Sequence, residues 1–121
     1  MPNYERWRAK IKPMGPKRIA LAYVATISIA EAEHAKGGLI PDSMDDKWSG
    51  FWNEGEIGFY RSWTGKQIYN LPVKPLDSGY EVGPLEVVDD PSIYRRSDDA
   101  ADLKLAATLL IRLIKRDASS A

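Results

Sequence analysis

The residues of this chain best suited to binding are aromatic side chains gathered around one arginine. Three of the four tryptophans fall within 16 residues, and a phenylalanine and a tyrosine directly precede the arginine. Tryptophan and arginine dominate the binding energy of many interfaces, and an arginine beside a ring can stack on it or hold a carboxylate or phosphate. The candidate binding residues are Trp48, Trp52, Arg61, Ser62, Trp63 and Thr64, with Asp45 and Asp46 as nearby acids.

The same residues also have a purely structural interpretation. If residues 56–63 form a strand, alternation places Arg61 on the same face as Phe59 and Trp63. The aromatic rings would then be core residues, and Arg61 would pair with Asp45 or Asp46. The sequence leaves both interpretations open.

Few other residues are suited to catalysis or to metal binding. The chain has no cysteine and a single histidine, His34, so it lacks a thiolate site and a multi-histidine site. The carboxylates of Asp42, Asp45 and Asp46 are hard ligands that calcium or magnesium would accept, but their spacing is not that of a calcium loop. We therefore expect no catalytic residue, no metal and no cofactor.

The charges balance overall, at 17 basic and 17 acidic residues among 121, but they are unevenly distributed. Residues 1–18 hold six basic side chains against one acid, and residues 19–60 hold seven acids against two basic side chains. A basic arm can bind nucleic acid or lie on the chain's own acidic part. Because residues 1–16 contain three prolines and no apolar period, we expect a flexible arm; the balanced charge disfavours nucleic-acid binding.

Two helices are predicted at the ends of the domain. Residues 17–36 carry apolar positions at helical spacing, are rich in alanine and precede two glycines, although their many β-branched residues favour a strand. Residues 98–115 begin with aspartates after Ser97, a candidate N-cap, and end with basic residues, which complements a helix dipole.

Short aromatic runs separated by turn residues predict strands between these helices. The strands are expected at residues 47–52, 56–63 and 66–73, with a fourth at residues 80–88, and Pro72 at a strand end or edge. The predicted fold is therefore α+β, a three- or four-stranded antiparallel meander with both helices packed on one face. We expect one domain over residues 17–117 and a tail at residues 118–121.

The C-terminal helix carries a second apolar stripe formed by Leu105, Leu109 and Leu113. An uncovered stripe would favour a homodimer in which identical helices pair. Alternatively, the helix predicted at residues 17–36 covers these leucines within one chain.

The segments Met44–Trp48 and Tyr60–Gly65, with Ile68 and Tyr69, resemble a set of small bacterial proteins of unknown function. These proteins carry an acidic segment with tryptophan, an Arg-Ser-Trp-Thr-Gly turn and an aspartate-rich start to a leucine-rich helix. The resemblance covers roughly residues 17–116 and implies a shared architecture without an activity. Gly50 and Gly58 stand where a bulkier residue is expected, which predicts looser strand packing there.

Three functions are compatible with these observations. The first is a non-enzymatic protein-binding or regulatory module that uses the aromatic and arginine surface. The second is a small enzyme acting on an anionic small molecule or nucleotide, with Arg61 as the anion clamp and Asp45 or Asp46 as the acid–base group. The third is nucleic-acid binding through the basic arm. The longest apolar stretch, residues 19–30, is too short to span a membrane, and the lack of cysteine fits a cytoplasmic protein.

Overall fold

The computed structural model describes residues 2–41, 47–53, 55–95 and 97–114. In chain order the elements are α1 (Pro2–Lys10), β1 (Arg18–Leu21), β2 (Ala25–Ser28), α2 (Ile29–Ala35), β3 (Trp48–Asn53), β4 (Glu56–Arg61), β5 (Gln67–Leu76), β6 (Gly79–Val82), β7 (Leu85–Val88) and α3 (Asp99–Ile114). The fold is α+β with an antiparallel sheet, as predicted.

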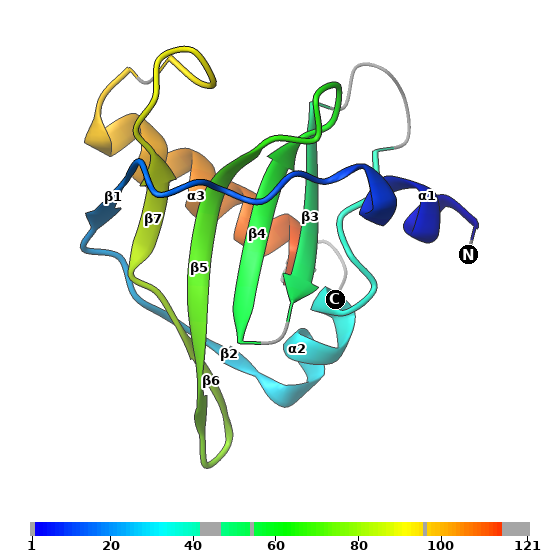
Figure 1. The fold of residues 1–121 in the computed structure, drawn as a ribbon. Helices are drawn as coiled ribbons and strands as arrows, with labels where there is room; N and C mark the ends of the chain where they lie inside the picture. The colour runs from blue at the N-terminus through cyan, green and yellow to red at the C-terminus, as the bar shows by residue number, and fades with distance from the viewer. Residues whose placement is uncertain (1, 42–46, 54, 96, 115–121) are drawn as a thin grey trace.

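The sheet has the strand order β1-β7-β5-β4-β3, and the long strand β5 joins it to a second set of pairs. The first half of β5 pairs with β4 and β7, and from Val73 onward β5 pairs with β6, which pairs with β2. Pro72 lies opposite Glu56, the first residue of β4, where β5 exchanges one partner for the other. In Figure 1, β5 and β6 extend beyond the other strands as a hairpin.

Helix α3 covers one face of the sheet, and the N-terminal segment (residues 5–18) crosses the opposite face (Figure 1). The apolar stripe of α3 is buried, as its helical spacing predicts. One hydrophobic cluster contains Ala106, Leu109, Leu110, Leu113 and Ile114 of α3 together with Ile57, Phe59, Leu71, Leu85 and Val87 of the strands. The N-cap of α3 differs from the prediction, because Asp98 rather than Ser97 accepts the hydrogen bond from Ala101 N, at 2.7 Å.

The helix predicted over residues 17–36 is wrong for most of its length. Its first part forms β1 and β2, which pair with β7 and β6, and only its last third forms α2. The β-branched residues of this stretch decided the outcome, since their side chains fit a pleated surface better than a helix. Helix α2 begins where a capping box forms, with Ser28 and Glu31 each accepting from the other's backbone N–H.

The strand count is also higher than the three or four predicted, because seven strands are present among the described residues. Two of the extra strands are β1 and β2. The third arises because the run predicted at residues 80–88 is divided into β6 and β7 at Gly83 and Pro84, which are joined by a cis peptide bond. The antiparallel order β3-β4-β5-β6 follows the predicted meander, whereas β7 returns to pair with β5 and β1.

The second apolar stripe of α3 is covered within the chain rather than left open. Leu109 and Leu113 are 1% and 0% exposed, Leu105 is half-buried, and α2 packs against α3. These leucines therefore match the alternative in which the chain itself covers them. The second apolar stripe is not an open surface on which another copy of the chain could pair. No helix in the described part of the chain has the length and apolar character needed to cross a membrane.

The sheet is not loosened at its two unusual glycines. A Cβ at Gly50 would lie 2.7 Å from Phe59 Cδ1, and a Cβ at Gly58 would lie 2.5 Å from Tyr60 Oη. Neighbouring aromatic side chains thus fill the space that the missing side chains leave. The expectation of looser packing at these positions was wrong, since each glycine makes room for a ring from its own sheet.

Candidate functional site: a cationic aromatic pocket and a polar sheet face

Arg61 and Trp48 meet because the register of the sheet places them directly opposite each other on β4 and β3. The guanidinium carbon of Arg61 lies 5.1 Å from the centroid of the Trp48 ring. The indole of Trp48 also stacks against Tyr69, with 5.6 Å between ring centroids and 17° between ring planes. Arg61 therefore rests on a ring that is itself part of the core.

A surface pocket of about 290 Å³ lies beside this stack and is lined by Lys47, Arg61, Trp63 and Thr64. Its backbone is held by a turn in which Gly65 N donates to Arg61 O at 2.7 Å, with Gly65 at φ +77°. Trp63 is 66% exposed, which is unusual for so large an apolar ring. The pocket therefore combines two cations, an accessible indole and a hydroxyl.

The structure brings some of the predicted site residues together and separates others. Arg61, Trp63 and Thr64 line the pocket with Lys47, a residue the prediction omitted, while Trp48 lies beneath Arg61. Ser62 is buried, and its backbone N–H donates to Lys47 O at 2.9 Å, so it positions the turn.

One predicted residue, Trp52, is not part of this pocket. Trp52 lies toward the other end of β3, where it packs edge-on against Tyr80 with 5.3 Å between ring centroids. Asp45 and Asp46, the predicted partners of Arg61, lie outside the described residues. Within the described residues Arg61 forms no ion pair.

A buried acid on α3 holds the ring on which Trp48 stacks. Tyr69 Oη donates to Asp102 Oδ1 at 2.8 Å and lies 3.3 Å from Tyr94 Oη. Burial raises the pKa of Tyr69 far above its usual value, and the hydrogen bonds to Tyr94 and Asp102 raise this pKa further. Asp102 was predicted only as a first-turn charge, although it lies four residues before Ala106 and so shares the apolar face.

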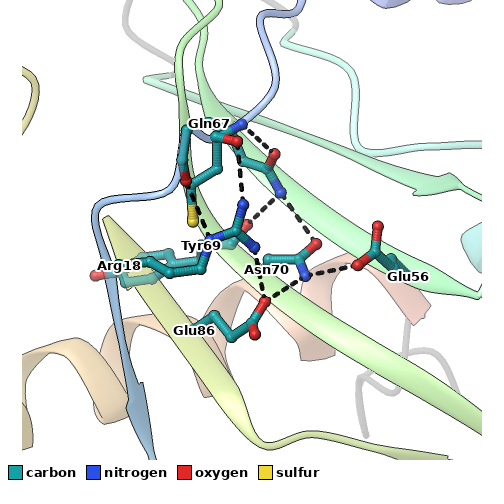
Figure 2. A network of polar contacts seen from close by, with 8 residues as sticks. Arg18, Glu56, Gln67, Tyr69, Asn70 and Glu86 are labelled. Carbon is teal, nitrogen blue, oxygen red and sulfur yellow. Dashed lines mark hydrogen bonds and ion pairs between the residues drawn. The ribbon is translucent and has the colours of Figure 1, made fainter. Parts of the chain in front are cut away.

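The opposite face of the sheet holds a second group of polar side chains that the sequence analysis missed (Figure 2). Gln67 and Asn70 are 8% and 3% exposed and are joined by a hydrogen bond of 3.1 Å from Gln67 Nε2 to Asn70 Oδ1. Asn70 Nδ2 donates to Glu56 Oε1 at 3.1 Å and to Glu86 Oε1 at 2.7 Å. One buried amide therefore orients two carboxylates from separate strands.

The N-terminal segment is attached to this network at Met14 and at Arg18, which Figure 2 shows beside Glu86. Met14 N donates to Gln67 Oε1 at 2.8 Å, and Arg18 donates to Glu86 Oε1 at 3.0 Å and to Met14 O at 3.1 Å. Because the backbone N–H of Met14 can only donate, Gln67 Oε1 must face it, which fixes the orientation of both amides.

A sequence signal for this cluster exists but is weak. Asn70 stands among apolar residues of a predicted strand, where an amide is uncommon unless it is hydrogen-bonded. Its partners Glu56 and Glu86 are 14 and 16 residues away, and only the register of β4, β5 and β7 brings them together.

Tyr60 and Asn53 extend this group of polar side chains toward β3. Asn53 Nδ2 donates to Tyr60 Oη at 3.1 Å. Burial raises the pKa of Tyr60 above its ordinary value, against the opposing effects of this hydrogen bond and of the nearby Arg8. The phenol is therefore neutral at physiological pH and can donate its proton.

The described residues include no group of three or more histidine, aspartate or glutamate side chains arranged to hold a metal ion. Comparison of the chain with protein-family models, curated proteins and solved structures gave no match. The resemblance to small bacterial proteins with an Arg-Ser-Trp-Thr-Gly turn stays a prediction.

Proposed function

We propose that this protein is a non-enzymatic binding module that recognises an acidic segment of a partner protein. The binding site is the pocket formed by Lys47, Arg61, Trp63 and Thr64. The observation that carries the proposal is the placement of two cations beside an indole that is 66% exposed. Carboxylates are the protein groups that such a pair of cations attracts.

The side chain of Arg61 is already held in a position that suits carboxylate binding. Its guanidinium lies over Trp48, at 5.1 Å from the ring centroid, and Trp48 is itself 8% exposed. A stacked guanidinium keeps its N–H donors free at the edge, so it can hold a carboxylate with two hydrogen bonds. Because the stack already restricts the side chain, less conformational entropy is lost on binding.

The size of the pocket favours a side chain over a complete small-molecule substrate. A volume of about 290 Å³ lies just below the range of about 300–1,000 Å³ typical of ligand pockets. Recognition of an anionic small molecule or nucleotide by an enzyme would use the same cations. The acid–base residues expected for that alternative, Asp45 and Asp46, lie outside the described residues.

The direct test is binding of a fluorescein-labelled peptide of alternating glutamate and glycine, measured by fluorescence anisotropy. We expect Arg61→Ala to weaken binding about tenfold or more, because truncating a central arginine of a binding site commonly costs this much. Lys74→Ala, which removes an exposed cation on β5, is the matched control and should leave affinity unchanged. A peptide with lysine in place of glutamate should not bind.

Equal affinity of wild type and Arg61→Ala for the acidic peptide would contradict the proposal. Binding should also weaken as salt concentration rises, since exposed charge pairs are screened. A pull-down from host lysate with the same two proteins then identifies the partner, as the species retained by wild type and lost with Arg61→Ala.

A further inference from the structure

The N-terminal segment, defined as residues 5–18, places two arginines on the polar side of the sheet. The Arg8 guanidinium carbon lies 5.6 Å from the centroid of the Phe51 ring. Arg18 Nη1 lies 3.0 Å from Glu86 Oε1. The most basic part of the sequence thus contributes guanidinium groups to both ends of one sheet face.

This polar face is a continuous row of cross-strand neighbours rather than a chance grouping. Phe51 pairs with Gly58, Gly58 with Asn70 and Asn70 with Glu86, so the row spans β3, β4, β5 and β7. Since neighbouring residues of a strand point to opposite faces, Asn70 points away from Tyr69, which is hydrogen-bonded to α3. The polar face is defined here by Phe51, Asn53, Glu56, Tyr60, Asn70 and Glu86.

The side chains of this face suit a guanidinium ligand. The Glu56 and Glu86 carboxylates are oriented by the same Asn70 amide, at 3.1 and 2.7 Å, and they lie at the two sides of it. The Phe51 ring supplies an apolar surface on which a planar cation stacks. Carboxylates and an aromatic ring are the two kinds of group that guanidinium ions bind best in proteins.

Arg8, which occupies this face in the structure, leaves hydrogen-bonding groups of the site without a partner in the described part of the chain. Arg8 Nη1 and Asn53 Oδ1 are both buried without a hydrogen-bond partner among the described residues. Buried polar atoms in native proteins nearly always have a partner, and each exception calls for an explanation. A donor and an acceptor left unpaired at the same end of the face indicate that Arg8 fits this position imperfectly.

The N-terminal segment is attached mainly by polar contacts, among them backbone hydrogen bonds from Lys12 N to Gly65 O and from Gln67 N to Lys12 O. Its contacts include the ion pair of Arg18 with Glu86, whose side chains are 32% and 27% exposed, and ion pairs of this kind are weak. Met14, at 9% exposure, is its buried apolar anchor. Helix α1 has nine residues, and helices of this length are not stable on their own in water.

We propose that the polar face is a binding site for arginine-bearing peptides, and that the chain's own N-terminal segment occupies this site as an internal competitor. The site is distinct from the pocket at Arg61, which is cationic and is proposed to take acidic groups. A peptide from another protein binds when its arginines fit Phe51, Asn53 and the two carboxylates better than Arg8 and Arg18 do. Its binding displaces the segment.

The test uses a fluorescein-labelled peptide with the sequence of residues 2–18 and the full-length chain. The acceptor is a variant carrying Arg8→Gln and Arg18→Gln, so that its own segment no longer supplies the two guanidinium groups that contact the polar face. We expect this variant to bind the peptide about tenfold or more tightly than wild type, because a tethered competitor acts at high effective concentration. Replacing Arg8 and Arg18 of the peptide by glutamine should abolish binding, although the peptide keeps Arg6.

Three further variants of this acceptor locate the site. Glu86→Gln should abolish peptide binding, whereas Lys74→Gln, an exposed change on β5, should leave it unchanged. Arg61→Ala should also leave it unchanged, so failure of this proposal and failure of the acidic-partner proposal are distinguishable. A peptide with lysine in place of Arg8 and Arg18 keeps the charge and should bind several-fold more weakly, because lysine lacks the planar fork.

Circular dichroism establishes that each variant is folded before binding is measured. If the double variant does not fold, Arg8→Gln alone serves as the acceptor, since it removes only the contact over Phe51. Equal affinity of this acceptor and wild type would overturn the proposal. Binding that survives Glu86→Gln, or equal binding of the lysine peptide, would overturn it as well.

Discussion

The two faces of the sheet are stabilised in different ways. On one face, α3 buries a continuous apolar stripe, and its one buried acid, Asp102, is hydrogen-bonded to Tyr69. On the other face, the N-terminal segment lies over amides and carboxylates and contacts them through hydrogen bonds and one ion pair. Apolar burial is strong and non-directional, whereas partly exposed polar contacts contribute little net stability. We therefore expect the first face to hold the fold together and the N-terminal segment to open from the second face without global unfolding.

The largest effect should come from removing apolar volume on the α3 face. We expect Leu109→Ala to lower the free energy of unfolding by about 2–5 kcal/mol, because the leucine is 1% exposed and its loss leaves a cavity. Urea denaturation followed by circular dichroism measures this change. Leu76→Ala, at a leucine that is 44% exposed on β5, is the control and should change stability by less than about 0.5 kcal/mol.

Equal effects of the two leucine substitutions would contradict the assignment of the core. A loss that depended on protein concentration would instead indicate that Leu109 contacts a second copy of the chain. The burial of Leu109 within one chain predicts that the loss is the same at every concentration.

Much of the α3 face can be predicted from the sequence, because its signals are local. The helical spacing of the leucines and the aromatic runs beside turn glycines place α3, β3, β4 and the first half of β5 within a few residues of their observed ends. Strands β1 and β2 were missed because an alanine-rich run satisfies a helical and an alternating pattern at once. The capping box at Ser28 and Glu31 was the local sign that a helix begins there rather than at residue 17.

The polar face is much harder to predict, since no single segment encodes it. Asn70 and its two carboxylate partners come from three strands, and a register shift by one residue would turn their side chains to the other face. The bulge between Phe59 and Tyr60 in the pairing of β4 with β5 has no sequence signal that we can identify. Of the residues that line the surface pocket, Arg61, Trp63 and Thr64 could be predicted because they lie within four consecutive positions, whereas Lys47 reaches the pocket only through the pairing of β3 with β4.

An intermediate effect should come from Tyr69, which links the sheet to α3. We expect Tyr69→Phe to lower stability at pH 7 by about 1.5–3 kcal/mol, since it removes a hydrogen bond to the buried Asp102 carboxylate. The same residue should produce a pH dependence. Burial raises the pKa of Tyr69 from its ordinary value near 10, so above that pH the unfolded chain loses a proton that the folded chain keeps.

Wild-type stability should therefore hold below about pH 10 and fall as the pH rises above it. Denaturant unfolding between pH 7 and pH 11 measures the slope, which should be shallower in Tyr69→Phe. Tyr80→Phe, at a half-buried tyrosine beside Trp52, is the control and should keep the wild-type slope. Parallel curves for wild type and Tyr69→Phe would show that this phenol does not couple folding to pH.

The smallest effect on global stability should come from Arg18→Gln, which detaches the N-terminal segment from Glu86. We expect a loss of about 0–1 kcal/mol, because the ion pair is partly exposed. The rate at which the N-terminal segment opens locally should change more than the global stability. The N–H of Lys12 donates to Gly65 O and that of Gln67 to Lys12 O, so hydrogen exchange at these two amides should speed up in the variant while α3 amides exchange as before. If Arg18→Gln instead accelerates exchange in α3 to the same degree, the two faces unfold as one unit. The N-terminal segment would then be part of the core structure rather than a cover that opens independently.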